Sequence, residues 1–167
     1  MFEDKISQRL VPLPAYIFPL VELIYYFGLK LCLCFHNPLV DTICLHYVTP
    51  IRGFYEQNIL VIFGILVLIF TTCSKGTISL PKFIRFNIIQ AILINIVISC
   101  IGQLYLLCPY QIRENYLLIN LVLNPGTIGA IIIIFYACIL VLLGRYPKIP
   151  IISEAARLQT QRGYSDS

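Results

Sequence analysis

Residues Phe83–Leu107 read FIRFNIIQAILINIVISCIGQLYLL, an apolar run that is interrupted by polar side chains. As an α-helix with a rise of about 1.5 Å per residue, this run would be about 37 Å long and would cross a hydrocarbon core of about 30 Å. Its polar residues are Arg85, Asn87, Gln90, Asn95 and Gln103. Polar groups inside lipid are costly unless they face another helix or a wet cavity. This span is therefore the best candidate for a functional surface.

The composition of the whole chain is typical of a membrane protein. Of its 167 residues, 59% are hydrophobic and 12% are charged, whereas about 25% are charged in an ordinary soluble domain. The length suffices for one small helical bundle and leaves no room for a separate soluble domain. Because the basic residues are scattered beside apolar runs, nucleic acid is not an expected partner. We therefore expect residues 1–167 to form a single polytopic membrane domain.

Four apolar segments predict four transmembrane helices, at about residues 14–35, 54–73, 83–107 and 116–143. Residues 36–58, between the first two spans, are apolar but broken by prolines and a glycine, which favours an interfacial or re-entrant segment. The tail, 144–167, contains two prolines and then the stretch ISEAARLQ, which predicts a short surface helix. The predicted fold is an all-α integral membrane protein.

The basic residues are unevenly distributed between the two sides of these spans. The N-terminus, the connection 74–82 and the tail share one side, which holds Lys5, Arg9, Lys75, Lys82, Arg85, Arg145, Lys148, Arg157 and Arg162. The other side holds Lys30, Arg52 and Arg113. This asymmetry predicts that both termini lie in the cytoplasm or in an equivalent compartment such as a plastid stroma.

Two interpretations fit the polar side chains of the third span. On a helical wheel, five residues fall within an arc of about 120°. They are Asn87, Ala91, Asn95, Ser99 and Gly102. Small residues and amides of this kind stabilise helix packing, at about 0.6 kcal/mol for each interhelical hydrogen bond. They can also form a hydrated face that lines a pathway for a polar substrate. The residues alone leave both interpretations open.

Polar residues also occur in the fourth and first spans. The fourth span contains Asn120, Asn124 and Pro125. The proline predicts a kink that frees a carbonyl group at membrane depth. Broken spans often mark transport sites, although proline is also common in ordinary membrane helices. Glu22, in the first span, would pair with a cation or a polar groove, or lie near the lipid headgroups on a tilted segment. The headgroup position is the favoured one.

The sequence predicts neither a metal site nor catalysis. Five residues, from the end of the first span into the connection that follows it, form a C-x-C-x-H and C-x-H pattern, which does not match the spacing of structural zinc ligands. They are Cys32, Cys34, His36, Cys44 and His46. No disulfide framework is apparent, and the sequence has no catalytic motif and no carboxylate pair inside a span. We expect no enzymatic activity and no cofactor.

Three blocks of sequence resemble the Tic-twenty family. They are LPAYIFPLVELIYYFG near the start, KFIRFNIIQAILINIV at 82–97 and GRYPKIPIISEAARLQ at 144–159. Their order and spacing match over nearly the whole chain. The most specific part is the Arg-Phe-Asn-x-x-Gln-Ala motif, Arg85–Ala91, followed by the Pro-x-x-Ser-Glu-Ala block, Pro150–Ala155. Members of this family are the four-helix subunit of the protein-import translocon in the chloroplast inner envelope, with relatives in cyanobacteria and plastid genomes.

The resemblance implies a location, a function and partners. It implies a plastid inner-envelope protein with both termini in the stroma, which contributes to a channel for unfolded precursor proteins. The implied partners are the lipid bilayer, other translocon membrane subunits, transiting precursors and further copies of the chain. Of the residues singled out, Arg85, Asn87, Gln90, Ser153 and Glu154 lie in matching blocks.

Alternatives remain at this point. One is a small-solute or ion transporter that uses Asn95, Gln103 and Asn124, and the other is a non-conducting membrane scaffold. The stretch with Ser153, Glu154 and Arg157 lies on the membrane surface or docks a stromal partner. The sequence leaves these choices open.

Overall fold

The protein is described from a computed structural model that places residues 8–35, 37–75 and 80–162. In this part of the chain, four helical stretches are long and apolar enough to cross a membrane: Gln8–Cys32, Pro38–Lys75, Lys82–Leu107 and Tyr116–Leu142. All regular elements of the described residues are helical. The predicted all-α membrane fold with four spans is confirmed.

The spans are divided into shorter elements by 3₁₀ and π turns, labelled η. In chain order the elements are η1 (Leu13–Tyr16), α2 (Ile17–Leu23), η2 (Ile24–Gly28), α3 (Leu29–Phe35), α4 (Pro38–Ile43), η3 (Cys44–Val48), α5 (Thr49–Lys75), α6 (Lys82–Leu107), α7 (Tyr110–Arg113), α8 (Tyr116–Leu118), η4 (Ile119–Leu123), α9 (Asn124–Leu142) and α10 (Ile152–Arg162).

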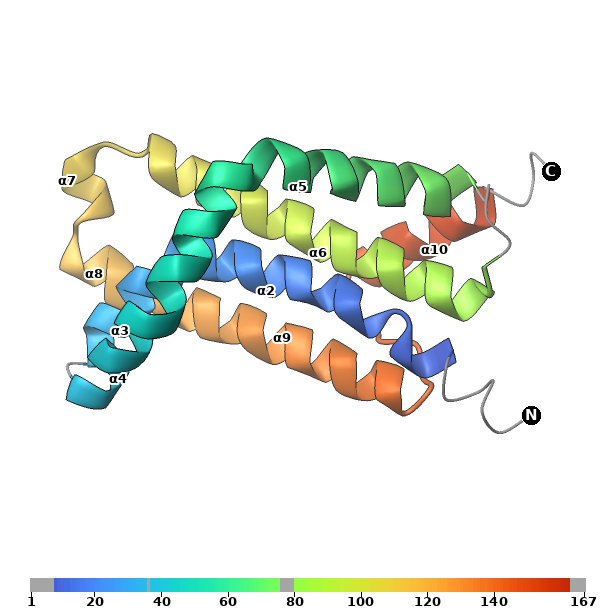
Figure 1. Cartoon of the computed structure of the whole chain (residues 1–167), viewed down its shortest axis with the longest axis horizontal. Coiled ribbons are helices and arrows are strands. Elements are labelled where there is room, and N and C mark those ends of the chain that lie inside the picture. Colours follow the sequence, from blue (N-terminus) through green and yellow to red (C-terminus); the bar gives the residue numbers. More distant parts are fainter. Residues whose placement is uncertain (1–7, 36, 76–79, 163–167) are drawn as a thin grey trace.

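The third span, α6, is the central helix of the bundle. It packs against α2, α5 and α10, and α2 separates it from α9 (Figure 1). In the most apolar part of α6, 61% of the residues are buried within the protein. In the corresponding part of the span that contains α5, the buried share is 11%. The polar residues of α6 therefore have protein neighbours, whereas α5 exposes most of its surface.

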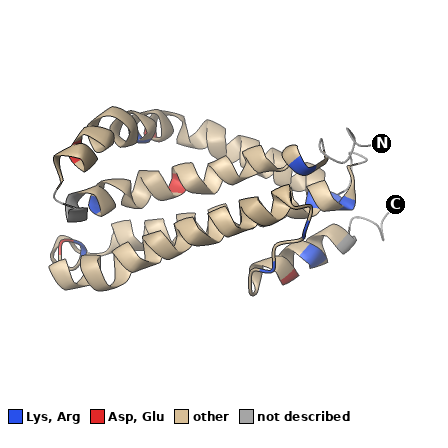
Figure 2. Ribbon diagram, turned by 90° about the horizontal axis from the view of Figure 1, so that it is seen from below, with Lys and Arg blue, Asp and Glu red and all other residues tan. Residues whose placement is uncertain are grey.

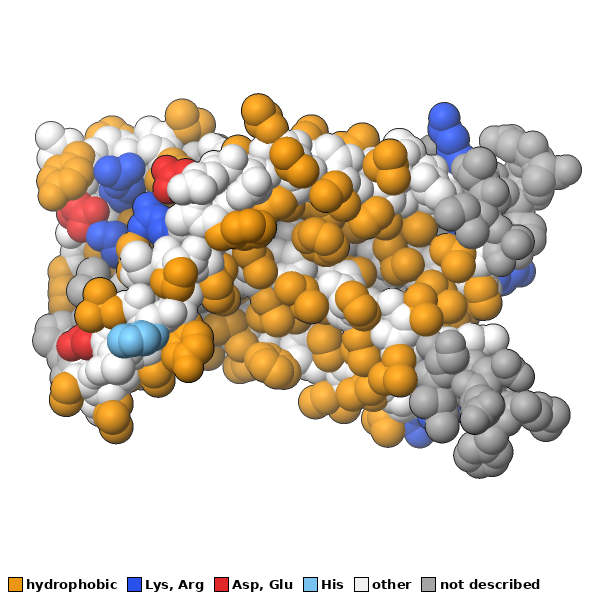
Figure 3. All heavy atoms as spheres, viewed as in Figure 1, with side chains coloured by type: hydrophobic (Ala, Val, Ile, Leu, Met, Phe, Trp, Pro, Cys, Tyr) orange, Lys and Arg blue, Asp and Glu red, His pale blue; other side chains and the backbone are white. Residues whose placement is uncertain are grey.

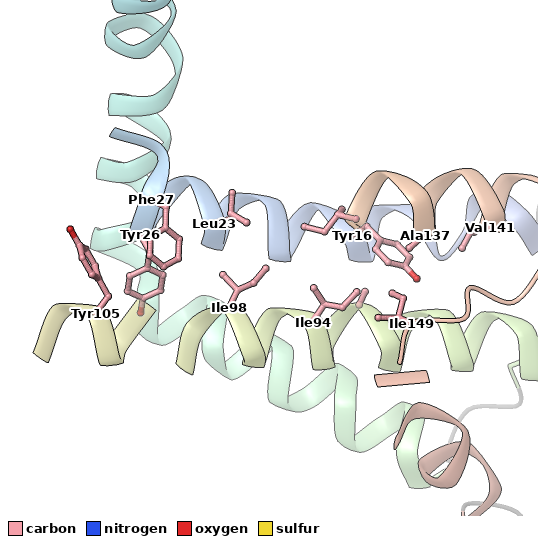
Figure 4. Packing of buried hydrophobic residues seen from close by; sticks show 12 residues of the cluster. Tyr16, Leu23, Tyr26, Phe27, Ile94, Ile98, Tyr105, Ala137, Val141 and Ile149 are labelled. Atoms are coloured by element: carbon pink, nitrogen blue, oxygen red, sulfur yellow. The ribbon is translucent and has the colours of Figure 1, made fainter. Parts of the chain in front are cut away.

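The apolar core lies between the first span, α6 and α9. Tyr16 and Leu23 of the first span pack in one cluster with Ile94 and Ile98 of α6 (Figure 4). Ala137, Val141 and Ile149 complete this cluster from the fourth span and the tail. Apolar side chains cover the middle of the outer face seen in Figure 3, and charged side chains lie toward its ends. This arrangement suits a bundle surrounded by lipid.

Lysine and arginine residues gather at the end of the bundle where α2 begins and α10 lies (Figure 2). This end carries Arg9, Lys75, Lys82, Arg145, Lys148 and Arg157. Lys5 and the side chain of Arg162 lie outside the described residues. At the opposite end, Lys30 forms a 2.5 Å ion pair with Glu114. Which side of the membrane each end faces stays a prediction.

Residues 38–58 form a helix that continues directly into the second span. The π turn Cys44–Val48 ends just before Pro50, and the Thr49 hydroxyl donates to the carbonyl of Cys44 at 3.1 Å. A wide turn of this kind tolerates the missing N–H and the ring of a proline. The segment bends away from the bundle before α5 runs beside α6 (Figure 1). The second helix is therefore longer than the predicted 54–73, and an interfacial position for its first part stays a prediction.

Another π turn, Ile119–Leu123, ends just before Asn124 and Pro125. The Asn124 N–H bonds to the carbonyl of Ile119, five residues earlier. The proline at position 125 thus follows a local widening of the helix.

Although no disulfide framework is apparent in the sequence, the structure contains a disulfide. Cys32 and Cys44 form a disulfide, with their Cα atoms 6.5 Å apart. The chain reverses at Asn37, whose side chain accepts a hydrogen bond from the Leu39 N–H and caps α4. This reversal brings the end of α3 against α4 and η3, which the linear spacing of the cysteines does not reveal. Among the described residues, no three His, Cys, Asp or Glu side chains form a possible metal site.

Gly102 lets the first span approach α6 closely. A Cβ atom at Gly102 would lie 2.3 Å from Cγ of Tyr26. Any larger residue at this position would therefore have to displace the Tyr26 ring.

We predict that Gly102→Ala destabilises the bundle by about 1–3 kcal/mol, the usual cost of overpacking. The matched control is Gly64→Ala in α5, where nothing lies within 4 Å of the added Cβ. Thermal unfolding of both variants in mild detergent measures the difference. Equal midpoints for the two variants would contradict this packing.

Candidate functional site

A groove of about 640 Å³ lies between the first span, α5 and α6. Its apolar wall comes mainly from α5, through Tyr55, Ile59, Leu60, Phe63 and Leu66. The opposite wall carries polar side chains, namely Glu22, Tyr26, Asn95, Ser99 and Gln103. We call these five residues the polar seam. They join the first span to α6.

Glu22 is buried at the centre of the polar seam. Its side chain is only 2% exposed, the Ser99 hydroxyl donates to its Oε1 atom, and the Asn95 side chain lies beside it. The expectation that Glu22 lies near the headgroups is therefore wrong, because its face of the helix turns toward α6. Burial of a carboxyl group in a span requires such partners.

Tyr26 extends the polar seam by one helical turn. Gln103 Nε2 donates to the Tyr26 hydroxyl oxygen at 2.7 Å. The ring of Tyr26 points from the first span toward α6, in the space left by Gly102 (Figure 4). The sequence contains a signal for this contact. Glu22 and Tyr26, and likewise Asn95 and Ser99, are four residues apart, which places the polar groups of each pair on one face of a helix.

Two oxygen atoms of the polar seam have no partner among the residues that the structure describes. Glu22 Oε2 and Asn95 Oδ1 are buried and accept no hydrogen bond from the described residues. Leaving a buried acceptor unsatisfied costs about 1–3 kcal/mol. Both atoms are acceptors, so a molecule with N–H or O–H donors would satisfy them.

Of the other predicted polar residues of α6, Arg85 holds a neighbouring element in place, whereas Asn87 bonds within its own helix. Arg85 is buried and donates to two carbonyl oxygens at the end of α5, from Nε to Cys73 at 2.9 Å and from Nη2 to Ser74 at 3.2 Å. It thereby satisfies carbonyls that the end of a helix leaves free. Asn87 Nδ2 donates to the carbonyl of Phe83 in its own helix at 2.8 Å.

Gln90 and Ser153 attach the tail to α6. Gln90 Nε2 donates to Ser153 Oγ at 3.2 Å. The same Ser153 oxygen accepts from the Ile149 N–H at 2.5 Å, and its hydroxyl donates to the Pro147 carbonyl at 3.0 Å. Two other predicted surface residues, Glu154 and Arg157, are exposed on α10.

The asparagines of the fourth span form a separate pair. Asn124 Nδ2 donates to Asn120 Oδ1 at 3.1 Å. Neither residue is among those that line the groove beside the polar seam. The structure thus brings Asn95 and Gln103 together and leaves Asn120, Asn124 and the exposed Pro125 elsewhere.

Comparison with known proteins finds similarity over nearly the whole chain. Residues 7–156 match the family described as chloroplast import apparatus, Tic20-like. A Tic20 family protein Ycf60 from Cyanidium caldarium is 32% identical over 160 residues, which are 94% of this chain and 75% of the relative. A Tic20 family protein from Synechocystis is 30% identical over 146 residues, 87% of this chain and 88% of the relative. No solved structure matches the chain significantly.

We predict that Arg85→Met destabilises the protein by about 2–3 kcal/mol, since it removes two hydrogen bonds from a charged donor and leaves carbonyls of α5 unpaired. Lys75→Met, at the exposed end of α5, is the control and should change stability little. Thermal unfolding in detergent measures both. If the two variants unfold at the same temperature, Arg85 does not hold the end of α5.

Proposed function

The chain belongs to the Tic20-like family of the chloroplast import apparatus, and from this premise we propose that it is a membrane subunit of a plastid protein translocon. In this proposal it lies in the inner envelope membrane with both termini in the stroma, and the groove beside the polar seam forms part of the path of an unfolded precursor. The observation that carries the proposal is the pair of buried acceptor oxygens, Glu22 Oε2 and Asn95 Oδ1.

An extended polypeptide has the chemistry that these acceptors require. Its backbone presents N–H donors at regular intervals whatever its sequence, so Glu22 and Asn95 can bind successive chains without selecting particular residues. The apolar wall of α5 offers a surface for side chains of many kinds. A site that accepts precursors of different sequence needs hydrogen bonds to the backbone and non-specific contacts with the side chains.

Movement of α5 would open the groove. The two acceptor oxygens are covered in this structure, so a precursor reaches them only when α5 separates from α6. The span that contains α5 is the least buried of the four. Contacts hold it toward both ends, where Tyr55 packs against Tyr25 with ring centroids 4.9 Å apart and Arg85 donates to the carbonyls of Cys73 and Ser74. Its middle can therefore bend outward while both ends stay attached.

The chain is too small to enclose a pore for a polypeptide by itself. Much of α5 and α9 exposes apolar side chains, including Leu60, Phe63 and Phe135. These surfaces suit contacts with other membrane subunits or with further copies of the chain. A non-conducting scaffold is the second candidate because these exposed faces would serve it equally well. A small-solute carrier has less support, since Asn124 does not line the groove.

Crosslinking from Cys100 tests the path directly. Cys100 is exposed and lines the groove, so it can carry a photoactivatable group when the other cysteines outside the disulfide are replaced by alanine. We predict that it crosslinks a labelled precursor arrested during import into isolated plastids. The control is Ile101→Cys in a Cys100→Ala background, because Ile101 is 51% exposed but is rotated by about 100° on the helix. Equal precursor crosslinks from both positions, or crosslinks to membrane subunits alone, would favour the scaffold.

Alanine substitutions separate the path from helix packing. We predict that Asn95→Ala lowers the import rate several-fold while the protein still assembles with its membrane partners, because it removes an acceptor from the groove. Gln90→Ala removes the bond to Ser153 and should loosen the tail without changing the groove. Import assays and native gels of the two variants measure these effects. If Asn95→Ala no longer assembles with its membrane partners, Asn95 stabilises helix packing and the path through the groove is not supported.

A further inference from the structure

A second cavity, of about 750 Å³, lies at the end of the bundle that holds the tail. Its walls come from the first turns of α6, from residues 146–148 and from α10. It shares no lining residue with the groove beside the polar seam. The proposed import path therefore does not account for it.

The charged residues around this cavity attract an anion. Lys82, Lys148 and Arg157 line it with one acidic residue, Glu154. Three positive charges and one negative charge leave a net charge of +2. Lysine and arginine at the edge of a membrane are the groups that bind phosphate headgroups.

The floor of the cavity is apolar and well packed. The Tyr146 ring meets Phe86 edge to face at a centroid distance of 5.1 Å, and it meets Phe83 in the same way at 5.3 Å. Phe86 and Pro147, which line the cavity, are buried. These contacts fix Tyr146 between the cations and the span, in the position that tyrosine favours at a membrane interface.

Lys82 and Phe86 lie at different depths along α6. Lys82 is the first residue of the helix, and Phe86 lies four residues further, about 6 Å along the axis. An anionic group bound by the cations would therefore lie at the level of the headgroups, with apolar surface beneath it. A free phosphate compound would use only the upper part of this arrangement.

We propose that this cavity binds the phosphate group of an anionic glycerophospholipid, with the phosphate near Lys148 and Arg157 and the start of an acyl chain against Phe86 and Tyr146. The bound lipid would touch both α6 and α10, and it would reinforce the link that Gln90 and Ser153 make between them. The tail helix is thereby held on the bundle by the membrane itself.

Lipid retention by the purified full-length protein tests this site without reference to import. The protein is reconstituted in vesicles of equal parts phosphatidylglycerol and phosphatidylcholine and extracted in mild detergent, and the retained lipid is quantified by mass spectrometry. We predict that phosphatidylglycerol is enriched and that Lys148→Gln and Arg157→Gln each lower the enrichment about fivefold, the effect of one basic residue near a membrane surface. Glu154→Gln should raise the enrichment, because among the described residues it removes the one acidic group lining the cavity.

Lys75→Gln is the matched control, since Lys75 lies at the same end of the bundle outside the cavity. Thermal unfolding verifies that each variant is folded. Absence of enrichment in the unchanged protein, or an equal loss in Lys75→Gln, would overturn the site. A second arm adds glycerol 3-phosphate to the protein in detergent. If this compound raises the unfolding temperature as much as phosphatidylglycerol does, the ligand is a soluble phosphate and the lipid assignment is overturned.

Discussion

The bundle depends on a helix that is central and polar at the same time. Lipid supplies no hydrogen bonds, so each polar group of α6 must find its partner in a neighbouring element. Arg85 binds the end of α5, Gln90 binds the tail through Ser153, and Ser99 binds Glu22 of the first span. Three segments are thus attached to α6 by polar contacts, and apolar packing fills the space between them. The polar residues of this span determine which elements surround it.

These contacts divide α6 into two parts with different properties. Near the tail, Arg85 and Gln90 attach neighbouring elements, and the buried oxygens Asn87 Oδ1 and Gln90 Oε1, which also lack a partner among the described residues, do not line the groove. In the middle of the span, Glu22 Oε2 and Asn95 Oδ1 lack partners beside a groove whose outer wall is the least buried span. Packing and pathway, the two interpretations of the amide-bearing face, therefore apply to different residues of the same helix. The proposed translocon function concerns the middle part alone.

Hydropathy predicted the four spans, because length and apolar content determine which segments can cross lipid. The resemblance of residues 82–97 and 144–159 to known sequences predicted the family. The partner of Glu22, the disulfide and the helical course of residues 38–58 were missed. Each depends on how two elements pack or on a π turn that accommodates a proline, and single-sequence patterns do not contain that information. Asn124 was grouped with Asn95 by residue type, although the bundle keeps the two apart.

The disulfide between Cys32 and Cys44 makes the first span and the start of the second helix a single mechanical unit. The disulfide holds α4 in a fixed position against α3. The stretch between Cys44 and the body of α5, which contains the π turn and Pro50, can then adjust when the middle of α5 bends outward. The disulfide thus fixes the position of α4 relative to α3, and the π turn beside it is where the helix can change direction.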